Sequence, residues 1–415
     1  MAIDLTTEIV ARWPDAEPAH ARMLADAGIT IVLTPGPPPE PFAKACAATR
    51  VRALPDSEIA FASLTAAEQA APDSPIAVNT GLWPGVRGAG ARKGPDEIAS
   101  ASREPWLDAN GFWIGYLRAL FPRRPAVLGY PAPAAGKMVP YTTLELALAE
   151  AWMTGGNYIL DVDERYRGAL LKGDAKALAA WKELGRTAAW LKQNRRLFGR
   201  PVMPVVCLLV DKSEASAEIA NMMYRRNASP ELCAVNRPPA YSPKRLAMVA
   251  VELEQLGDAE RGRILDHARA GTTVVTNRMK PAADWKKLKS QEDRDFYGLG
   301  KGQVVVYRDS IDDPSEFALD VIDIITHKQR AIRLWNALAV IPLATQGEAG
   351  GALLHLVNYG SPLDIDFPAR VRGDYTKAEL LRPEAAPLPL KTAKRGPSTE
   401  VVVPELRRVA TVRLS

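Results

Sequence analysis

Hydrophobic positions in the first half of the chain fall into short apolar runs separated by stretches with helical spacing. The runs that predict strands include GITIVLT (28–34), PIAVNTG (75–81), PAVLGY (125–130) and NYILDV (157–162). WLDANGFWIGYLRALF (106–121) and TLELALAEAWMTG (143–155) have the spacing of helices. Such alternation predicts a parallel sheet covered by helices. The number of strands over residues 1–200 favours a reduced or complete (β/α) barrel over an open sheet.

Residues 201–309 form a second alternating unit. VMPVVCLLVD (202–211) is continuously apolar, as is typical of a strand covered on both faces. LDHARAGTTVVTN (265–277) gives a helix, a glycine stop and a strand. We therefore expect a flavodoxin-like α/β domain here. A helical connection over 310–337 should follow, because FALDVIDIITHKQRAIRLW is amphipathic throughout.

The periodicity changes from residue 338 onward, where apolar and polar residues alternate with period two. Short segments such as ALLHLVNYG (352–360) are separated by Gly, Pro and Ser. This pattern predicts a small antiparallel β-sandwich over 338–415.

Composition and charge exclude several classes of protein. The 415 residues are too many for one ordinary core, and 47% apolar with 24% charged residues is typical of a globular protein. The net charge is only +5, and the basic residues are scattered over the chain, which argues against a nucleic-acid partner. We find no apolar run of transmembrane length and no signal-peptide pattern, so we expect a soluble protein without a membrane partner. An exported or periplasmic location stays open if a leader has been removed.

The cysteines and histidines predict no metal site and no cofactor. Cys207 and Cys233 lie in the apolar runs VVCLLV and ELCAV and are expected to be small buried side chains. The 3 cysteines and 4 histidines show no zinc-binding spacing.

The order of these parts resembles that of a known group of enzymes. The resemblance is carried by LDHARAGTTVVTN (265–277), GLGKGQVVVYRD (298–309), LLHLVNYGS (353–361) and ELLRPE (379–384). The chain resembles the barrel glycoside hydrolases typified by the beta-galactosidases, which carry a glutamine-amidotransferase-like trimerisation domain and a C-terminal β-domain. The resemblance implies a carbohydrate substrate or ligand and a homo-oligomer formed through the middle domain. Amidotransferase chemistry is not expected, because the strand RLAMVAVE runs into Glu252 and Leu253 without a cysteine at the turn.

Glycoside hydrolysis requires two carboxyl groups on either side of the scissile bond. Asp161 closes the NYILDV strand and shares a face with Asn157, at the edge where ligands of parallel α/β proteins bind. We predict that Asp161 is the nucleophile, with Asn157 and Asp163 contributing to substrate binding. The competing interpretation is that Asp161 and Asp163 only cap the helix that follows.

The second acid is less well defined by the sequence. The resemblance implies an Asn-Glu pair at the end of a middle strand, and PIAVNTGLWPG supplies Asn79 without the glutamate. Glu104 is the preferred replacement, because it precedes a proline and is expected to be extended. Arg103 beside it would favour the ionised, basic form. Glu97 is the next candidate, while Asp108 either contributes to the site or caps the helix through Tyr116.

Trp83 follows the strand around PIAVNTG and predicts a platform on which a sugar ring stacks, with Asn79 and Arg103 as polar binding groups. The sequence therefore favours a carbohydrate-active, hydrolase-like protein. The alternative is a non-catalytic carbohydrate-binding or assembly protein that retains the architecture. An enzyme should place two acids in one pocket, at least one of them with a raised pKa.

Overall fold

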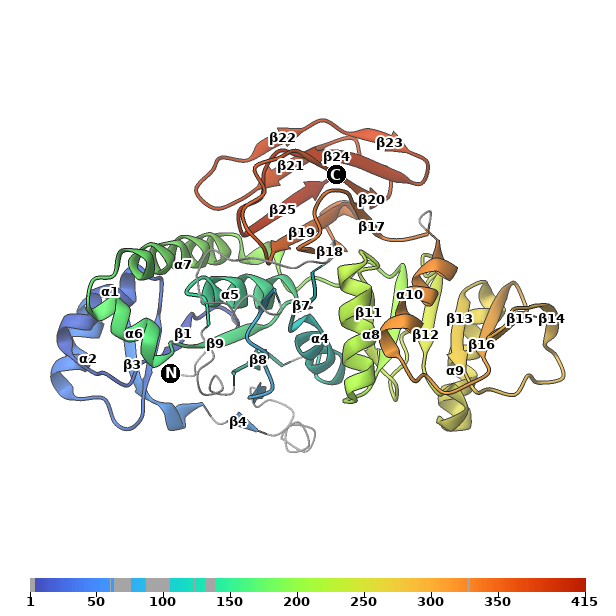
Figure 1. Cartoon of the computed structure of the whole chain (residues 1–415), viewed down its shortest axis with the longest axis horizontal. Helices are drawn as coiled ribbons and strands as arrows, with labels where there is room; N and C mark the ends of the chain where they lie inside the picture. The colour runs from blue at the N-terminus through green and yellow to red at the C-terminus, as the bar shows by residue number, and fades with distance from the viewer. Residues whose placement is uncertain are drawn as a thin grey trace.

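The computed structural model describes residues 4–59, 61–62, 76–86, 105–122, 124–130, 139–326 and 329–415. The predicted site residues Glu97, Arg103 and Glu104 lie outside these ranges. Figure 1 shows three groups of elements: a barrel region (β1 to α7), a middle region (β10 to α10) beside it, and a sandwich (β17 to β25) that lies over both. This is the predicted fold class of a partial barrel, a middle α/β sheet and an antiparallel sandwich.

The barrel region is built on one parallel sheet with the strand order β3-β2-β1-β9-β8-β5-β4. Its strands are β1 (Val10–Arg12), β2 (Ile31–Thr34), β3 (Arg52–Pro55), β4 (Phe61–Ala62), β5 (Ile76–Val78), β8 (Ala126–Leu128) and β9 (Asn157–Asp161). The helices are α1 (Ala21–Asp26), α2 (Glu40–Ala48), α4 (Gly111–Leu120), α5 (Thr143–Met153), α6 (Glu164–Leu171) and α7 (Ala175–Gln193). β6 (Gly85–Val86) and β7 (Leu107–Asp108) form a separate antiparallel pair.

The inner faces of the barrel strands form their own small apolar core. Its fully or nearly buried members include Val10, Ile31, Leu33, Ala77, Val127 and Ile159. Side chains alternate along a strand, so Arg12 and Asp161 point to the same side as Val10 and Ile159. Both residues end their strands. They therefore lie at the carboxyl-terminal end of the barrel, which we call the mouth.

The middle region has a mixed sheet with the order β11-β10-β12-β13-β16-β15-β14, in which the first five strands are parallel. The strands are β10 (Val206–Val210), β11 (Glu231–Ala234), β12 (Ala247–Ala250), β13 (Thr273–Asn277), β14 (Lys286–Ser290), β15 (Arg294–Leu299) and β16 (Gly302–Tyr307). The helices are α8 (Glu214–Arg225), α9 (Asp258–Ala270) and α10 (Pro314–Ile325). The sequence pattern predicted the parallel part and did not reveal the β14–β15 hairpin.

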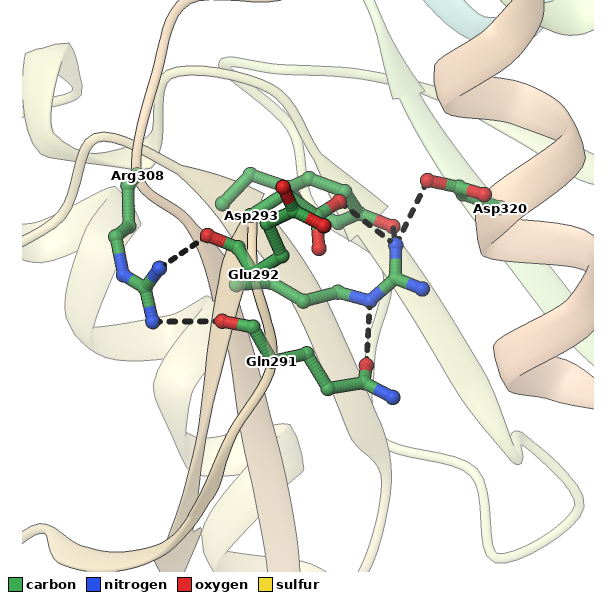
Figure 2. Close-up of polar contacts among 7 residues, drawn as sticks. Gln291, Glu292, Asp293, Arg308 and Asp320 are labelled. Carbon is green, nitrogen blue, oxygen red and sulfur yellow. Dashed lines mark hydrogen bonds and ion pairs between the residues drawn. The ribbon is translucent and has the colours of Figure 1, made fainter.

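Two arginines hold this hairpin in place (Figure 2). Nη1 of Arg294 donates to Oδ2 of Asp320 on α10 at 2.7 Å, and its Nε donates to Oε1 of Gln291 at 2.9 Å. Arg308, just after β16, donates to the backbone carbonyls of Gln291, at 2.8 Å, and of Glu292. The turn between β14 and β15 is thereby fixed to both β16 and α10.

Two antiparallel sheets, β17-β20-β24-β23 and β18-β19-β25-β21-β22, make up the sandwich. The strands are β17 (Ile332–Leu334), β18 (Val340–Gln346), β19 (Ala352–Asn358), β20 (Phe367–Arg372), β21 (Ala378–Leu381), β22 (Leu388–Leu390), β23 (Ala393–Arg395), β24 (Ser398–Val403) and β25 (Val409–Leu414). The expectation of an amphipathic helix through residue 335 is wrong. Helix α10 ends at Ile325, and Ile332–Leu334 alternates buried and half-buried residues as β17, paired with β20.

Helix α5 is enclosed by protein on every side. It packs between β9 of the barrel sheet and β19 of the sandwich, and each of its residues is buried. This enclosure accounts for its lack of a polar face. It also carries Glu145 and Glu150 into the interior. No helix among the described residues has the length and apolar character needed to cross a bilayer.

The junction between α7 and the end of α1 depends on a glycine. A Cβ atom at Gly185 of α7 would lie 2.3 Å from the carbonyl oxygen of Asp26 and 3.1 Å from Cα of Ala27. We expect Gly185→Ala to lower the free energy of unfolding by about 1–3 kcal/mol. Gly168→Ala is the matched control, because a Cβ at Gly168 in α6 meets nothing within 4 Å. That change should raise the free energy of unfolding by up to about 1 kcal/mol.

Urea denaturation of both variants would check these opposite signs. If Gly185→Ala were as stable as Gly168→Ala, α7 would not approach the end of α1 as closely as described.

Candidate active site at the mouth of the barrel

At the mouth, the side chain of Arg12 lies between the carboxylates of Asp56 and Asp161. Nη1 of Arg12 lies 3.7 Å from Oδ2 of Asp161, and its Nε donates to Oδ1 of Asp56 at 3.2 Å. Asp56 directly follows β3, so the three side chains come from the ends of β3, β1 and β9, with β2 between β3 and β1 in the sheet. The side chain of Asp161 is 36% exposed. Its carboxyl group is therefore held by an ion pair and still reaches solvent.

The surroundings of Asp161 raise the pKa of its carboxyl group above the ordinary value of an aspartate. Partial burial is the largest cause, because it disfavours the charged form. The charges of Arg12 and Arg167 act in the opposite direction, and the charge of Asp56 adds to the rise. The group consequently retains its proton to a higher pH than an exposed aspartate.

The neighbouring acid, Asp163, has a structural contact of its own. Its side chain accepts a hydrogen bond of 3.0 Å from the backbone N–H of Tyr166 and forms the N-cap of α6. Capping of this kind satisfies an otherwise unpaired helix donor. Of the two acids in the LDVD segment, Asp163 caps a helix and Asp161 faces the mouth.

Asn79 and Trp83 lie on the segment that follows β5. Asn79 is exposed and Trp83 is half-buried. The ring of Trp83 stacks on Tyr130, which follows β8, with centroids 4.2 Å apart. Tyr130 in turn stacks on Tyr158 of β9 at 4.9 Å. The three rings form a continuous stack that runs from the segment after β5, past the end of β8, to the second residue of β9.

A polar network connects the Trp83 segment to the sandwich. The amide of Asn110 accepts from the backbone N–H of Leu82 at 2.6 Å and donates to its carbonyl at 2.9 Å. Asn110 also donates to Oε2 of Glu150 at 3.0 Å. The hydroxyl of Tyr359, just after β19, donates to Oε1 of Glu150 at 2.6 Å. Glu150 thus links the sandwich, through Asn110, to the residue before Trp83.

Glu150 is fully buried, and burial raises its pKa to about 7. Hydrogen bonds from Tyr359 and Asn110 favour the charged form and limit the rise. The sequence analysis missed this group. The available signal was an acid in a helix whose neighbours are nearly all apolar, which predicts burial of the acid as well.

Asn157 lies at the opposite end of β9 from Asp161. Its amide donates to the carbonyls of Leu5 and Glu8, each at 2.8 Å, and accepts from Nε1 of Trp152 at 3.2 Å. Four residues of strand separate it from Asp161 by about 13 Å. Asn157 therefore anchors the N-terminal segment below the barrel and is not brought together with the mouth residues.

Asp108 belongs to β7 and pairs with Gly85 of β6. Helix α4 begins only at Gly111, and its N-cap position is occupied by Asn110. The alternative interpretation of Asp108 as the N-cap is therefore wrong, because the chain is still extended at that residue.

Arg12 and Asp56 were not among the residues predicted for the site. A signal for Arg12 is present in EIVARW, where it alternates with Val10 on a short apolar run. Asp56 follows the strand-like VRALP in the same manner as Asp161 follows NYIL. Both are polar residues at the carboxyl ends of strands, which is the criterion that selected Asp161.

Three cavities lie away from the mouth. One of 240 Å³ and one of 620 Å³ are lined by α7 and the sandwich, where Arg186 pairs with Glu384 at 2.9 Å. A third, of 460 Å³, lies at the amino ends of β8 and β9 and includes Gly156. The first two cavities lie between the barrel region and the sandwich. The third cavity is at the end of the barrel opposite Asp161.

The sequence matches no protein-family model and no curated protein. Solved structures do match. The crystal structure of a beta-galactosidase from Bacillus circulans sp. alkalophilus is similar with a TM-score of 0.57, 9% identity and coverage of 100% of both chains. The chain shares its fold with glycoside hydrolases. The predicted resemblance to the beta-galactosidases is thereby confirmed for the fold.

A second similar structure is an alpha-L-fucosidase isoenzyme 2 from Paenibacillus thiaminolyticus, with a TM-score of 0.50 and 8% identity. The match covers 70% of this chain and 60% of the fucosidase chain. The fold is thus shared by glycoside hydrolases with different activities, so the chemistry of this chain has to be inferred from its own residues.

Proposed function

We propose that this chain is a carbohydrate-active protein of the glycoside hydrolase type, with its ligand bound at the mouth of the barrel. The observation that supports the proposal is the position of Asp161. Its carboxyl group faces the barrel interior at a strand end, is partly exposed and has a raised pKa. Ligands of barrel enzymes bind at this end of the strands.

In the proposed reaction, one carboxyl group donates a proton to the leaving oxygen and the other attacks the sugar or activates water. Asp161 is one member of the pair. Glu104, and after it Glu97, is the proposed partner, and Asp56 is the alternative from the described residues because it shares Arg12 with Asp161. Trp83, Asn79 and Arg103 would contact the sugar.

A second function, carbohydrate binding or assembly without hydrolysis, is favoured by one contact. Arg12 engages both Asp56 and Asp161, so that one guanidinium holds both carboxyl groups in ion pairs. Such a pair recognises hydroxyl groups without transferring a proton. Assembly through the middle region would be compatible with this function.

The test is a screen of aryl glycosides with the wild type, Glu104→Gln, Glu97→Gln and Asp56→Asn, alongside a glycan-binding assay. We expect the wild type to cleave at least one glycoside and Glu104→Gln to lose about 100-fold or more in rate. A comparable loss in Asp56→Asn alone would identify Asp56 as the partner acid. Binding without cleavage would support the second function, and neither binding nor cleavage would contradict both.

A further inference from the structure

Two cysteines and a glutamate meet at one edge of the middle sheet. The Sγ atoms of Cys207 and Cys233 and a carboxylate oxygen of Glu231 all lie within 4.8 Å of one another. Cys207 is on β10, and Glu231 and Cys233 are two residues apart on β11. In the parallel register, Cys207 is opposite Glu231, and Cys233 is opposite Leu209. The pairing places all three side chains on the same face of the sheet.

The cluster is accessible from one side. Cys207 is buried, whereas Cys233 and Glu231 are half-buried. Among the described residues, no strand lies beyond β11 on that side, because β11 is the first strand of its sheet. An ion could therefore reach the two sulfur atoms past β11, and a water molecule could complete its coordination.

Arg245 holds the carboxylate of Glu231 in place. Its side chain is 2% exposed, and Nη2 donates to Oε2 of Glu231 at 2.6 Å. Nη1 donates to the carbonyl of Ala240, at 2.8 Å, in the segment that leads into β12. This arrangement fixes the orientation of the carboxylate. Carboxylate ligands of metals are commonly oriented by such a second hydrogen bond.

We propose that Cys207, Cys233 and Glu231 form a binding site for a thiolate-preferring divalent metal ion such as zinc. Two thiolates with an oxygen ligand select zinc over magnesium or calcium. The charges also agree. Two thiolates and one carboxylate with the guanidinium of Arg245 sum to −2, and a divalent ion brings this partly buried group to neutrality.

A disulfide is the competing use of two neighbouring cysteines, and the register disfavours it. Cys207 and Cys233 occupy diagonal positions on adjacent strands. Two residues along a strand and one strand across correspond to a Cα separation of about 8 Å. Disulfides span at most about 7 Å between Cα atoms. A metal bridges the longer gap, because it adds two bonds of about 2.3 Å between the sulfur atoms.

The site would stabilise the junction between two regions. Strand β11 packs on α4 of the barrel region, where a Cβ at Gly115 would lie 2.7 Å from Leu232. A metal that ties β11 to β10 would hold this contact in place. Bound metal should therefore raise the melting temperature of the full chain in proportion to the logarithm of its concentration.

The experiment titrates the reduced, chelator-treated full chain with Co²⁺ and then displaces it with Zn²⁺. We expect thiolate-to-cobalt charge-transfer absorption at one ion per chain. Cys207→Ser and Cys233→Ser should each weaken binding about 100-fold or more, and Glu231→Gln about 10- to 100-fold. The matched control is Cys46→Ser, because Cys46 is buried on α2 of the barrel region. That variant should bind as the wild type does.

Three results would overturn the proposal. These are cobalt binding without charge-transfer absorption, equal affinity in Cys233→Ser and the wild type, or a Cys207–Cys233 disulfide in protein purified without reductant. If Cys207→Ser fails to fold because that position is buried, Cys233→Ser decides the question, since Cys233 is only half-buried.

Discussion

Replacing Asp161 with asparagine is expected to lower kcat/KM about a thousandfold or more for any glycoside that the wild type cleaves. The change keeps the size of the side chain and removes the group that would attack or transfer a proton. Binding of the same sugar should fall much less, because the amide still offers a hydrogen-bond acceptor. The measurement is steady-state kinetics on an aryl glycoside. It is combined with a binding assay for the free sugar that the reaction releases.

Asp163→Asn is the matched control for this prediction. It makes the same change two residues further on, where the carboxylate caps α6. Asparagine is about as good an N-cap as aspartate, so both stability and activity should stay near those of the wild type. Equal losses in the two variants would mean that the segment tolerates no change, and full activity of Asp161→Asn would show that Asp161 is not catalytic.

The sequence was sufficient to predict that Asp161 ends a strand, because the relevant information is local. Side chains alternate along a strand, so that Asn157, Ile159 and Asp161 share one face, and the strand-like run ends at the acid. The observed strand Asn157–Asp161 has this extent, and Ile159 belongs to the inner core of the barrel. A regular strand of five residues can be recognised from its own local sequence pattern.

Arg12 was missed because the short apolar run of its strand, Val10–Arg12, is ended by the arginine itself. The pattern therefore does not identify a strand, and β1 exists through its parallel pairing with β2 on one side and β9 on the other. The same holds for β7 and β17, which the spacing assigned to helices. Long-range pairing decides such segments, and one sequence does not contain it in readable form.

The cysteine cluster shows the same limit. Cys207 and Cys233 lack a zinc-binding spacing along the chain, and a whole helix, α8, lies between them. The parallel pairing of β10 with β11 brings them together. Residue types can be noted from the sequence, whereas their meeting depends on strand order in the folded sheet.

Glu150 provides the largest effect expected on stability. Its pKa of about 7 in the folded protein is above the ordinary value of 4.5 for a glutamate. An acid with a raised pKa stabilises the fold fully below its unfolded pKa, and this contribution is lost as the pH rises through its folded pKa. Relative to Glu150→Gln, the wild type should therefore lose about 3 kcal/mol of unfolding free energy between pH 4.5 and pH 7.

Urea denaturation of the wild type and Glu150→Gln at a series of pH values would measure this difference. Tyr359→Phe is the second variant, because it removes a hydrogen bond that lowers the pKa of Glu150. It should extend the loss of stability to higher pH, because it raises the folded pKa and leaves the unfolded pKa unchanged. Curves of wild type and Glu150→Gln that stay parallel across this range would show that Glu150 is charged in the fold at all these pH values. In that case Asn110 and Tyr359 would hold the carboxylate strongly enough to outweigh its burial.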